Sequence, residues 1–266
     1  MIRNAVLFEC KRGFRSRGFR ISCLIGFSIC ILDLFFFCKI FWQDLDCKVI
    51  SQAWIGTDFQ LAFNNLYYVL FPILAALPFG SSYYQDLKTG YVKNLCIKIS
   101  RKEYFAAKSI AVFLTAFAAV TMPLAFDLIL CMGIVPLHTP EKLAFLDIGI
   151  LDRNLFTEIF YTVPALYCVL FILLDGVFAG ILSLYSVCIA EKVESAFSAI
   201  AAPFAVYILS GVALAGDNEG NWSVMEMVNP IQFYTTRVEQ LLICMAGGSA
   251  IAAIVIILKG RKKDFL

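Results

Sequence analysis

The feature that most restricts the fold of this chain is a set of six long apolar segments separated by short polar ones. A helix that crosses the hydrocarbon core of a bilayer needs about 20 apolar residues. Only 16% of the residues are charged, whereas a soluble domain usually has about a quarter. We therefore expect an all-α polytopic membrane protein, with residues 1–266 forming a single transmembrane domain. The six predicted spans cover residues 20–42, 65–85, 104–126, 161–189, 196–215 and 239–258.

The distribution of positive charge predicts how these spans are oriented. The net charge is only +2, but 17 of the 22 Lys and Arg residues fall in segments on one side of the predicted spans, and 4 fall on the other side. Membrane proteins keep their basic residues mainly on the cytoplasmic side. We therefore expect both ends of the chain in the cytoplasm, in a cell (plasma) membrane that we take to be bacterial.

The first segment, residues 1–19, is basic and has an apolar or cysteine residue at every fourth position from Ile2 to Phe14. This pattern predicts an amphipathic interfacial helix whose Lys and Arg side chains contact anionic lipid headgroups. Gly13 and Gly18 lower the helix propensity of the segment. A disordered basic leader is therefore the alternative interpretation.

Several kinds of site have no counterpart in the sequence. The chain has no G-x4-G-K-[ST] motif and no Gly-Lys dipeptide, so it lacks the loop that holds nucleotide phosphates in P-loop proteins. His138 is the single histidine, and no Cys-x-x-Cys pair or zinc-type spacing occurs. We expect no enzymatic activity, metal or cofactor on this chain, and no nucleic-acid partner.

The loop between the second and third predicted spans, residues 86–103, contains a short amphipathic segment. Its apolar residues recur at helical spacing, with Lys93 on another face. The apolar stripe consists of Val92, Leu95, Cys96 and Ile99. One interpretation is a lever through which a partner moves both adjoining spans, and the alternative is a helix that rests on the membrane surface.

The end of this loop predicts a firm start for the third span. Ser100 and Glu103 have the spacing of a capping box, in which the serine hydroxyl accepts from the backbone amide of the glutamate and the glutamate reaches back to the serine amide. We therefore predict that the loop forms two short rigid pieces and not a flexible linker.

The stretch from Asp86 to Lys108, D-x3-G-x8-I-S-R-x2-Y-x3-K, resembles the corresponding loop of type-2 ATP-binding-cassette (ABC) transporter permeases. The order of elements is also similar, with a basic amphipathic helix before the first of six spans and broken helices before the last, where Asn229 and Pro230 lie. Specific residues match only in this one loop. By this resemblance, the ATPase-coupling loop contains Asp86, Gly90, Val92, Lys93, Leu95, Ile99, Ser100, Arg101 and Glu103.

The resemblance implies the membrane subunit of an ABC exporter. Two copies, or one copy and a related permease, would form the path in contact with membrane lipid, and two separate ATPase subunits would bind ATP and Mg. From the habits of this family, we expect a hydrophobic or amphipathic substrate such as an antimicrobial peptide.

Two acidic residues near the middle of predicted spans suggest a different function. Asp33 lies in the first span and Asp175 in the fourth. A charge at the bilayer centre costs about 2.5–3.5 kcal/mol on insertion scales, so each carboxyl group needs a partner, water or a proton. An ion-coupled transporter or channel that uses both residues is the alternative function, and structural carboxyl groups between helices are the simpler explanation. A membrane sensor or assembly factor is a third possibility.

Overall fold

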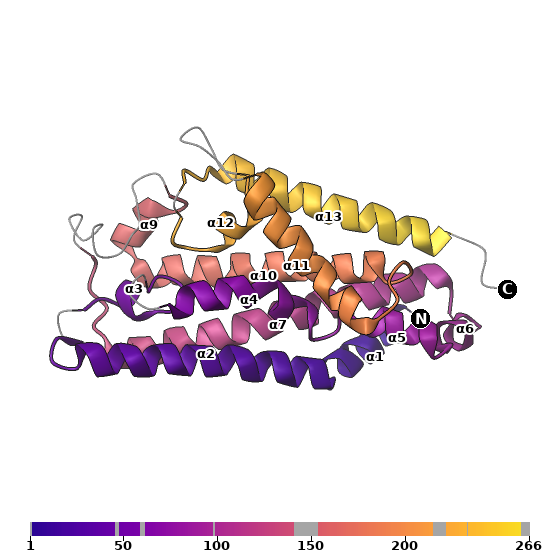
Figure 1. Cartoon of the computed structure of the whole chain (residues 1–266), viewed down its shortest axis with the longest axis horizontal. Helices are drawn as coiled ribbons and strands as arrows, with labels where there is room; N and C mark the ends of the chain where they lie inside the picture. Colours follow the sequence, from indigo (N-terminus) through magenta and orange to yellow (C-terminus); the bar gives the residue numbers. More distant parts are fainter. Residues whose placement is uncertain are drawn as a thin grey trace.

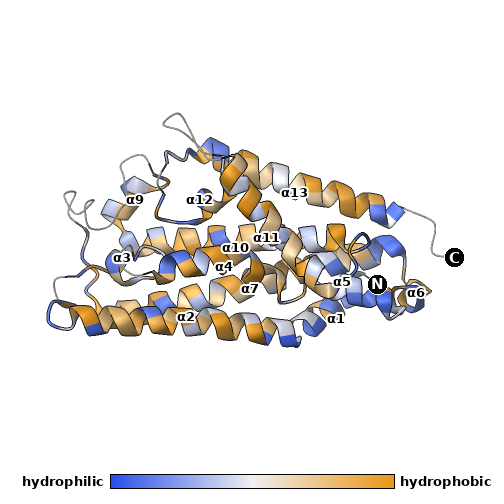
Figure 2. Cartoon of the chain, viewed as in Figure 1, coloured by the Kyte–Doolittle hydropathy of each residue, from blue (hydrophilic) through white to orange (hydrophobic). Residues whose placement is uncertain are grey.

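The computed structural model describes residues 2–45, 48–58, 62–97, 99–140, 154–214, 222–232 and 234–261. Every regular element in these ranges is a helix. Five helices are long and apolar enough to cross a membrane, and Figure 2 shows that their hydrophobic residues extend along most of their lengths. A polytopic membrane protein is thereby confirmed. The five helices are α2 (Arg17–Phe41), α7 (Arg101–Ile134), α10 (Pro164–Ile189), α11 (Ala196–Ala213) and α13 (Val238–Arg261).

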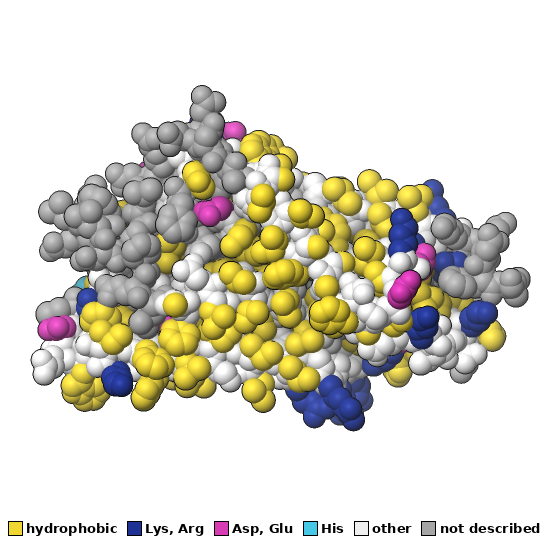
Figure 3. Space-filling model, viewed as in Figure 1, with side chains coloured by type: hydrophobic (Ala, Val, Ile, Leu, Met, Phe, Trp, Pro, Cys, Tyr) yellow, Lys and Arg dark blue, Asp and Glu magenta, His cyan; other side chains and the backbone are white. Residues whose placement is uncertain are grey.

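The long helices form an elongated bundle in which α7 and α10 occupy the centre (Figure 1). Helices α1 (Ile2–Phe14), α5 (Ser82–Lys88) and α6 (Tyr91–Cys96) lie at one end of the bundle, near the last turn of α13. Helices α3 (Ile50–Ala53), α9 (Thr157–Thr162) and α12 (Val224–Val228) lie toward the other end. Figure 3 shows hydrophobic side chains across the middle of the visible face, with most of the visible Lys and Arg side chains toward the α1 end.

The second predicted span, residues 65–85, is divided into two helices. Helix α4 (Phe63–Ala76) has only 14 residues, and α5 follows after a turn that contains Pro78. Proline has no backbone N–H, so Pro78 leaves the Leu74 carbonyl oxygen without its usual helical donor. The Ser22 hydroxyl of α2 donates to that oxygen at 2.7 Å. The break is thus stabilised by a neighbouring helix, as expected for proline in membrane helices.

The two central helices pack closely because of two glycines on α10. A Cβ atom at Gly176 would lie 2.5 Å from the Thr121 side chain, and one at Gly180 would lie 2.3 Å from the Phe113 ring. Small residues at this four-residue spacing let membrane helices approach each other. The partner of this G-x-x-x-G pair is α7 of the same chain.

The segment between the first and second predicted spans folds into the bundle as well. Trp54 and Ile55 are fully buried. The Trp54 indole donates to the Leu124 carbonyl at 3.2 Å, and the Ile55 amide donates to the Asp127 carboxylate at 3.0 Å. The middle of this segment therefore packs against α7.

The interfacial helix was predicted over residues 1–19, and the observed helix is shorter. Helix α1 ends at Phe14, and the Ser16 hydroxyl caps α2 by accepting from the Phe19 amide at 2.9 Å. Ser16 also donates to the Pro78 carbonyl at 2.7 Å, which attaches the start of α2 to the turn after α4.

Candidate functional site

The loop of residues 86–103 contains the end of α5 and all of α6, joined by a tight turn, and the first residues of α7. Helix α5 carries Asp86, and Gly90 precedes α6 with a φ of 71°. This left-handed conformation favours glycine over residues with a Cβ atom, and no other group of the described residues lies within 4 Å of the place where a Cβ would be. Glycine at position 90 is therefore favoured by the backbone conformation of the turn between the two helices and not by close packing.

The predicted apolar stripe of α6 faces the protein itself. Val92 is buried, and Leu95 and Ile99 are half-buried against the hydrophobic cluster that contains Tyr104. The outward face carries Lys93, Asn94 and Ile97, and Ile97 is 84% exposed. The surface that α6 offers to a partner is therefore mixed, with one large apolar side chain beside a basic one.

The predicted capping box is confirmed at the start of α7. The Ser100 hydroxyl accepts from the Glu103 amide at 3.3 Å, and the Glu103 carboxylate accepts from the Ser100 amide at 3.1 Å. Arg101 lies over the Phe105 ring at 5.6 Å. The loop thus enters α7 through a fixed, hydrogen-bonded turn.

A buried ionic cluster joins α1, α5 and α7. It consists of Glu9 and Arg12 on α1, Asp86 on α5, and Lys108 on α7. The Lys108 ammonium is fully buried and lies 2.6 Å from Asp86 Oδ2 and 3.0 Å from Glu9 Oε2. Arg12 pairs with the same two carboxylates, at 3.2 Å from Glu9 Oε1 and with a direct ion pair to Asp86. Two cations and two anions alternate, so the cluster balances its own charge.

Aromatic side chains surround this cluster. The Tyr104 hydroxyl donates to Asp86 Oδ2 at 2.8 Å, and Lys108 Nζ lies 4.3 Å from the centre of the Phe79 ring. The Arg12 guanidinium lies over the Tyr91 ring at 4.6 Å. Burial disfavours the charged form of Arg12, but its hydrogen bond and charge interaction with Asp86 outweigh this and raise its pKa above the ordinary value.

The ion pairs of this cluster hold the three helices together. Removing one member of a buried ion pair costs about 3–5 kcal/mol, because the remaining charge has no partner. A displacement of α5 away from α7 would have to pull Asp86 from Lys108. These ion pairs therefore resist the separation of α1, α5 and α7.

A second set of contacts joins α5 to the turn between α10 and α11. The Tyr83 hydroxyl donates to Glu191 Oε1 at 2.6 Å, and Lys259 of α13 lies 3.5 Å from the same carboxylate. The Tyr84 hydroxyl donates to the Glu194 carbonyl. Helix α5 is thus linked through Tyr83 and Tyr84 to the turn that joins α10 and α11.

The two acidic residues predicted inside spans are both buried but do not meet. The Tyr68 hydroxyl donates to Asp175 Oδ2 at 3.1 Å. Neither carboxylate oxygen of Asp33 has a hydrogen-bond partner among the described residues, and Asp33 lies within electrostatic range of Asp58 and Asp127. Asp175 is therefore part of an interhelical hydrogen bond, whereas Asp33 belongs to a separate acidic group toward the α3 end of the bundle.

Sequence reasoning identified half of the ionic cluster. The motif quoted above contains Asp86, Tyr104 and Lys108, which converge on one point, but Glu9 and Arg12 were not singled out. A signal was available, because Glu9 is the only acidic residue in the first 32 positions, three residues before an arginine. No protein-family model, curated protein or solved structure matches this chain.

Proposed function

We propose that this chain is the membrane subunit of an ATP-driven exporter, with α5, α6 and the start of α7 as the element on which a separate ATPase acts. The ionic cluster is the observation that carries the proposal. A solvated loop would not need a fully buried ammonium paired with carboxylates from two other helices. Such a connection is useful where force on the loop has to reach the membrane helices.

The transmission path follows from the contacts. Force on α6 passes through the Gly90 turn to α5, then through Asp86 to Lys108 on α7 and through Tyr83 to Glu191 beside α10. Helices α7 and α10 form the centre of the bundle, so motion of α5 changes the position of the core. ATP would be bound by the partner, because the chain itself has no P-loop motif.

The proposal includes six membrane passes with both ends in the cytoplasm. Helix α4 is too short to span by itself, and α5 extends the same pass beyond the Pro78 turn. The α1 and α6 end, where basic side chains gather, would be the cytoplasmic end by the positive-inside rule. The protein would work as a dimer, or with a related permease, and would move a hydrophobic or amphipathic substrate outward through a bacterial cell membrane.

The direct test is cross-linking in the native host. A photo-reactive amino acid at Ile97, on the exposed face of α6, should capture a P-loop ATPase on irradiation. The same amino acid at Trp42, which is 74% exposed at the opposite end of the bundle, is the matched control and should capture none. If no ATPase is found with Ile97, Lys93 or Asn94 as the cross-linking position, the exporter proposal is wrong.

A companion variant tests the contact surface. Ile97→Asp together with Lys93→Glu changes the outward face of α6 without touching the buried stripe, so it should abolish ATPase association while insertion stays normal. Leu95→Asp and Ile99→Asp are less informative, because both positions pack against the protein's own core. Unchanged association after the outward-face substitutions would exclude α6 as the docking element.

Ion-coupled transport is the second candidate, and Asp33 is the observation that favours it. A buried carboxyl group without any hydrogen-bond partner is expensive in a membrane and often marks a proton or ion path. Asp33→Asn should then eliminate pH-dependent transport by the purified protein in vesicles. Asp175→Asn keeps a hydrogen-bonding partner for Tyr68 and separates a role in ion transport from a role in packing. Equal transport by the wild type and Asp33→Asn would exclude ion coupling through Asp33.

A further inference from the structure

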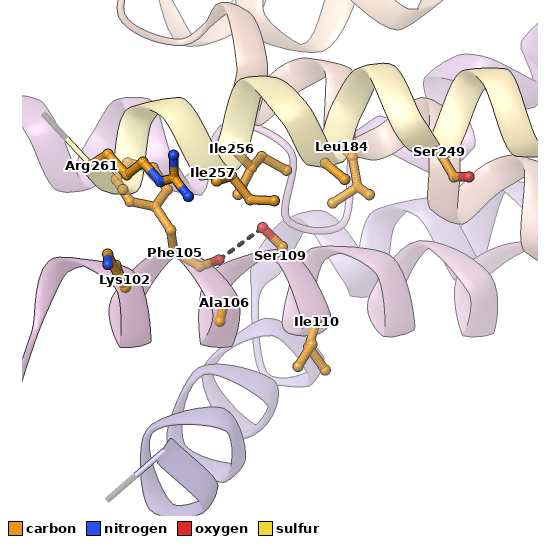
Figure 4. A pocket seen from close by; sticks show the side chains of 12 residues that line it. Lys102, Phe105, Ala106, Ser109, Ile110, Leu184, Ser249, Ile256, Ile257 and Arg261 are labelled. Carbon is orange, nitrogen blue, oxygen red and sulfur yellow. Dashed lines mark hydrogen bonds between the residues drawn. The ribbon is translucent and has the colours of Figure 1, made fainter.

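A groove of about 430 Å³ runs between α7 and α13, with Leu184 of α10 at its floor. Figure 4 shows Lys102 and Arg261 together at one end of this groove, one on each helix, and mostly apolar side chains with Ser109 and Ser249 along the rest. The groove is independent of the ionic cluster, which lies on the α1 side of α7.

The walls of the groove repeat at helical spacing. On α7 they include Phe105, Ala106 and Ile110, and on α13 they include Ala253 and Ile257. Residues three and four apart share one helix face, so one complete face of each helix is turned to the groove. Small side chains on both sides leave a space that the chain itself does not fill.

The polar groups along the walls are already satisfied by their own helices. The Ser109 hydroxyl donates to the Phe105 carbonyl at 2.8 Å, and the Ser249 hydroxyl donates to the Ala246 carbonyl at 3.0 Å. The long part of the groove therefore has no hydrogen bond to offer and suits a hydrocarbon chain.

The end of the groove has the opposite character. Lys102 and Arg261 are both exposed, and neither forms an ion pair in the part of the chain that the structure describes. The two helices contact each other at this end, where a Cβ atom at Gly260 would lie 3.6 Å from the Lys102 Cα. The two positive charges thus flank the point at which the apolar groove opens to the end of the bundle.

We propose that this groove binds an anionic phospholipid, with an acyl chain along the apolar walls and the phosphate between Lys102 and Arg261. The combination of an apolar slot and paired cations at its end matches that one amphiphile, and basic residues beside membrane helices bind anionic headgroups. The volume lies in the range of small-molecule sites and is too small for a helix about 10 Å across. The proposal does not depend on the exporter function.

The test is a lipid titration of the delipidated protein in detergent, followed by native mass spectrometry. Phosphatidylglycerol should bind with a stoichiometry of about one at low concentration, and phosphatidylcholine with the same acyl chains should bind more weakly. Lys102→Gln combined with Arg261→Gln should weaken phosphatidylglycerol binding by roughly 25-fold and leave phosphatidylcholine unchanged. Arg3→Gln with Lys192→Gln is the matched control, which removes two exposed charges at the same end of the bundle.

A second variant examines the apolar part. Ala253→Trp places a large side chain in the groove without changing any charge, and it should reduce the binding of both lipids. Ile251→Trp, at an exposed position on the opposite face of α13, should not. Equal losses in the Gln pair and its control would mean general electrostatic attraction and would overturn the proposal. So would unchanged binding in Ala253→Trp, or a protein dimer that the Gln pair disrupts in the absence of lipid.

Discussion

Lys108→Met is the substitution that examines the ionic cluster most directly. Methionine retains most of the length and apolar stem of the lysine but removes the ammonium group. Each contact between Lys108 Nζ and a carboxylate, at 2.6 and 3.0 Å, is worth about 6 kcal/mol before solvation at an effective dielectric constant near 20. Burying the ammonium group cancels several kcal/mol of this attraction, and the expected loss of unfolding free energy is about 3–5 kcal/mol.

The loss should fall when the charge balance is restored. In Lys108→Met the two buried carboxylates share only Arg12, and the cluster has a net charge of −1. Adding Asp86→Asn returns the cluster to neutrality, with Glu9 paired to Arg12 at 3.2 Å. The double variant should therefore be more stable than the sum of the two single losses predicts, by about 1–3 kcal/mol.

The assay is reversible unfolding of the purified protein in mixed micelles of increasing SDS content, read by tyrosine and tryptophan fluorescence. Lys93→Met is the matched control, because Lys93 is an exposed lysine of α6, and its unfolding free energy should change by less than about 0.5 kcal/mol. A loss below about 1 kcal/mol in Lys108→Met, or strictly additive losses in the double variant, would refute a tightly coupled cluster.

Two further predictions concern local packing and helix capping. Gly18→Ala should destabilise the protein by about 1–3 kcal/mol, because the new Cβ would lie 2.1 Å from the Leu77 carbonyl oxygen. In the same SDS titration, Gly247→Ala, which meets no atom within 4 Å, should be neutral or up to about 1 kcal/mol stabilising, and equal effects of the two would contradict the close contact. Ser100→Ala removes the cap of α7 and should cost about 1 kcal/mol, with faster amide exchange at Glu103 measured by hydrogen–deuterium exchange, whereas unchanged exchange would argue against the capping box.

The helical membrane class and the positions of most long helices could be predicted from the sequence. Uninterrupted apolar segments about 20 residues long can satisfy their backbone groups in lipid only as helices or closed barrels, so the pattern itself restricts the fold. The capping box at Ser100 was predictable for a similar reason, because its two side chains act within four residues. The second span was predicted as one helix of residues 65–85. The effect of Pro78 depends on whether a neighbouring side chain donates a hydrogen bond to the freed Leu74 carbonyl, as Ser22 does.

The candidate site was only partly predictable. The loop and its motif were visible in the sequence, including Asp86 and Lys108, but their meeting point with Glu9 depends on how α1 packs against α7. Similarly, the stripe of α6 was recognised, yet its direction was open, because a short amphipathic segment can face lipid, a partner or its own protein. Only the packed structure places that stripe inward and leaves Ile97 on the outside.

What the sequence determined by itself was therefore local: apolar length, charge distribution and the hydrogen bonds of a capping box, each set by residues close together in the chain. What only the tertiary structure decided were contacts across large sequence separations, above all the pairing of Glu9 with Lys108 and of Tyr83 with Glu191. A charged side chain in a basic leader costs nothing while it is solvated. Its burial becomes favourable only when a partner of opposite charge arrives from a distant helix, and that arrangement is a property of the fold.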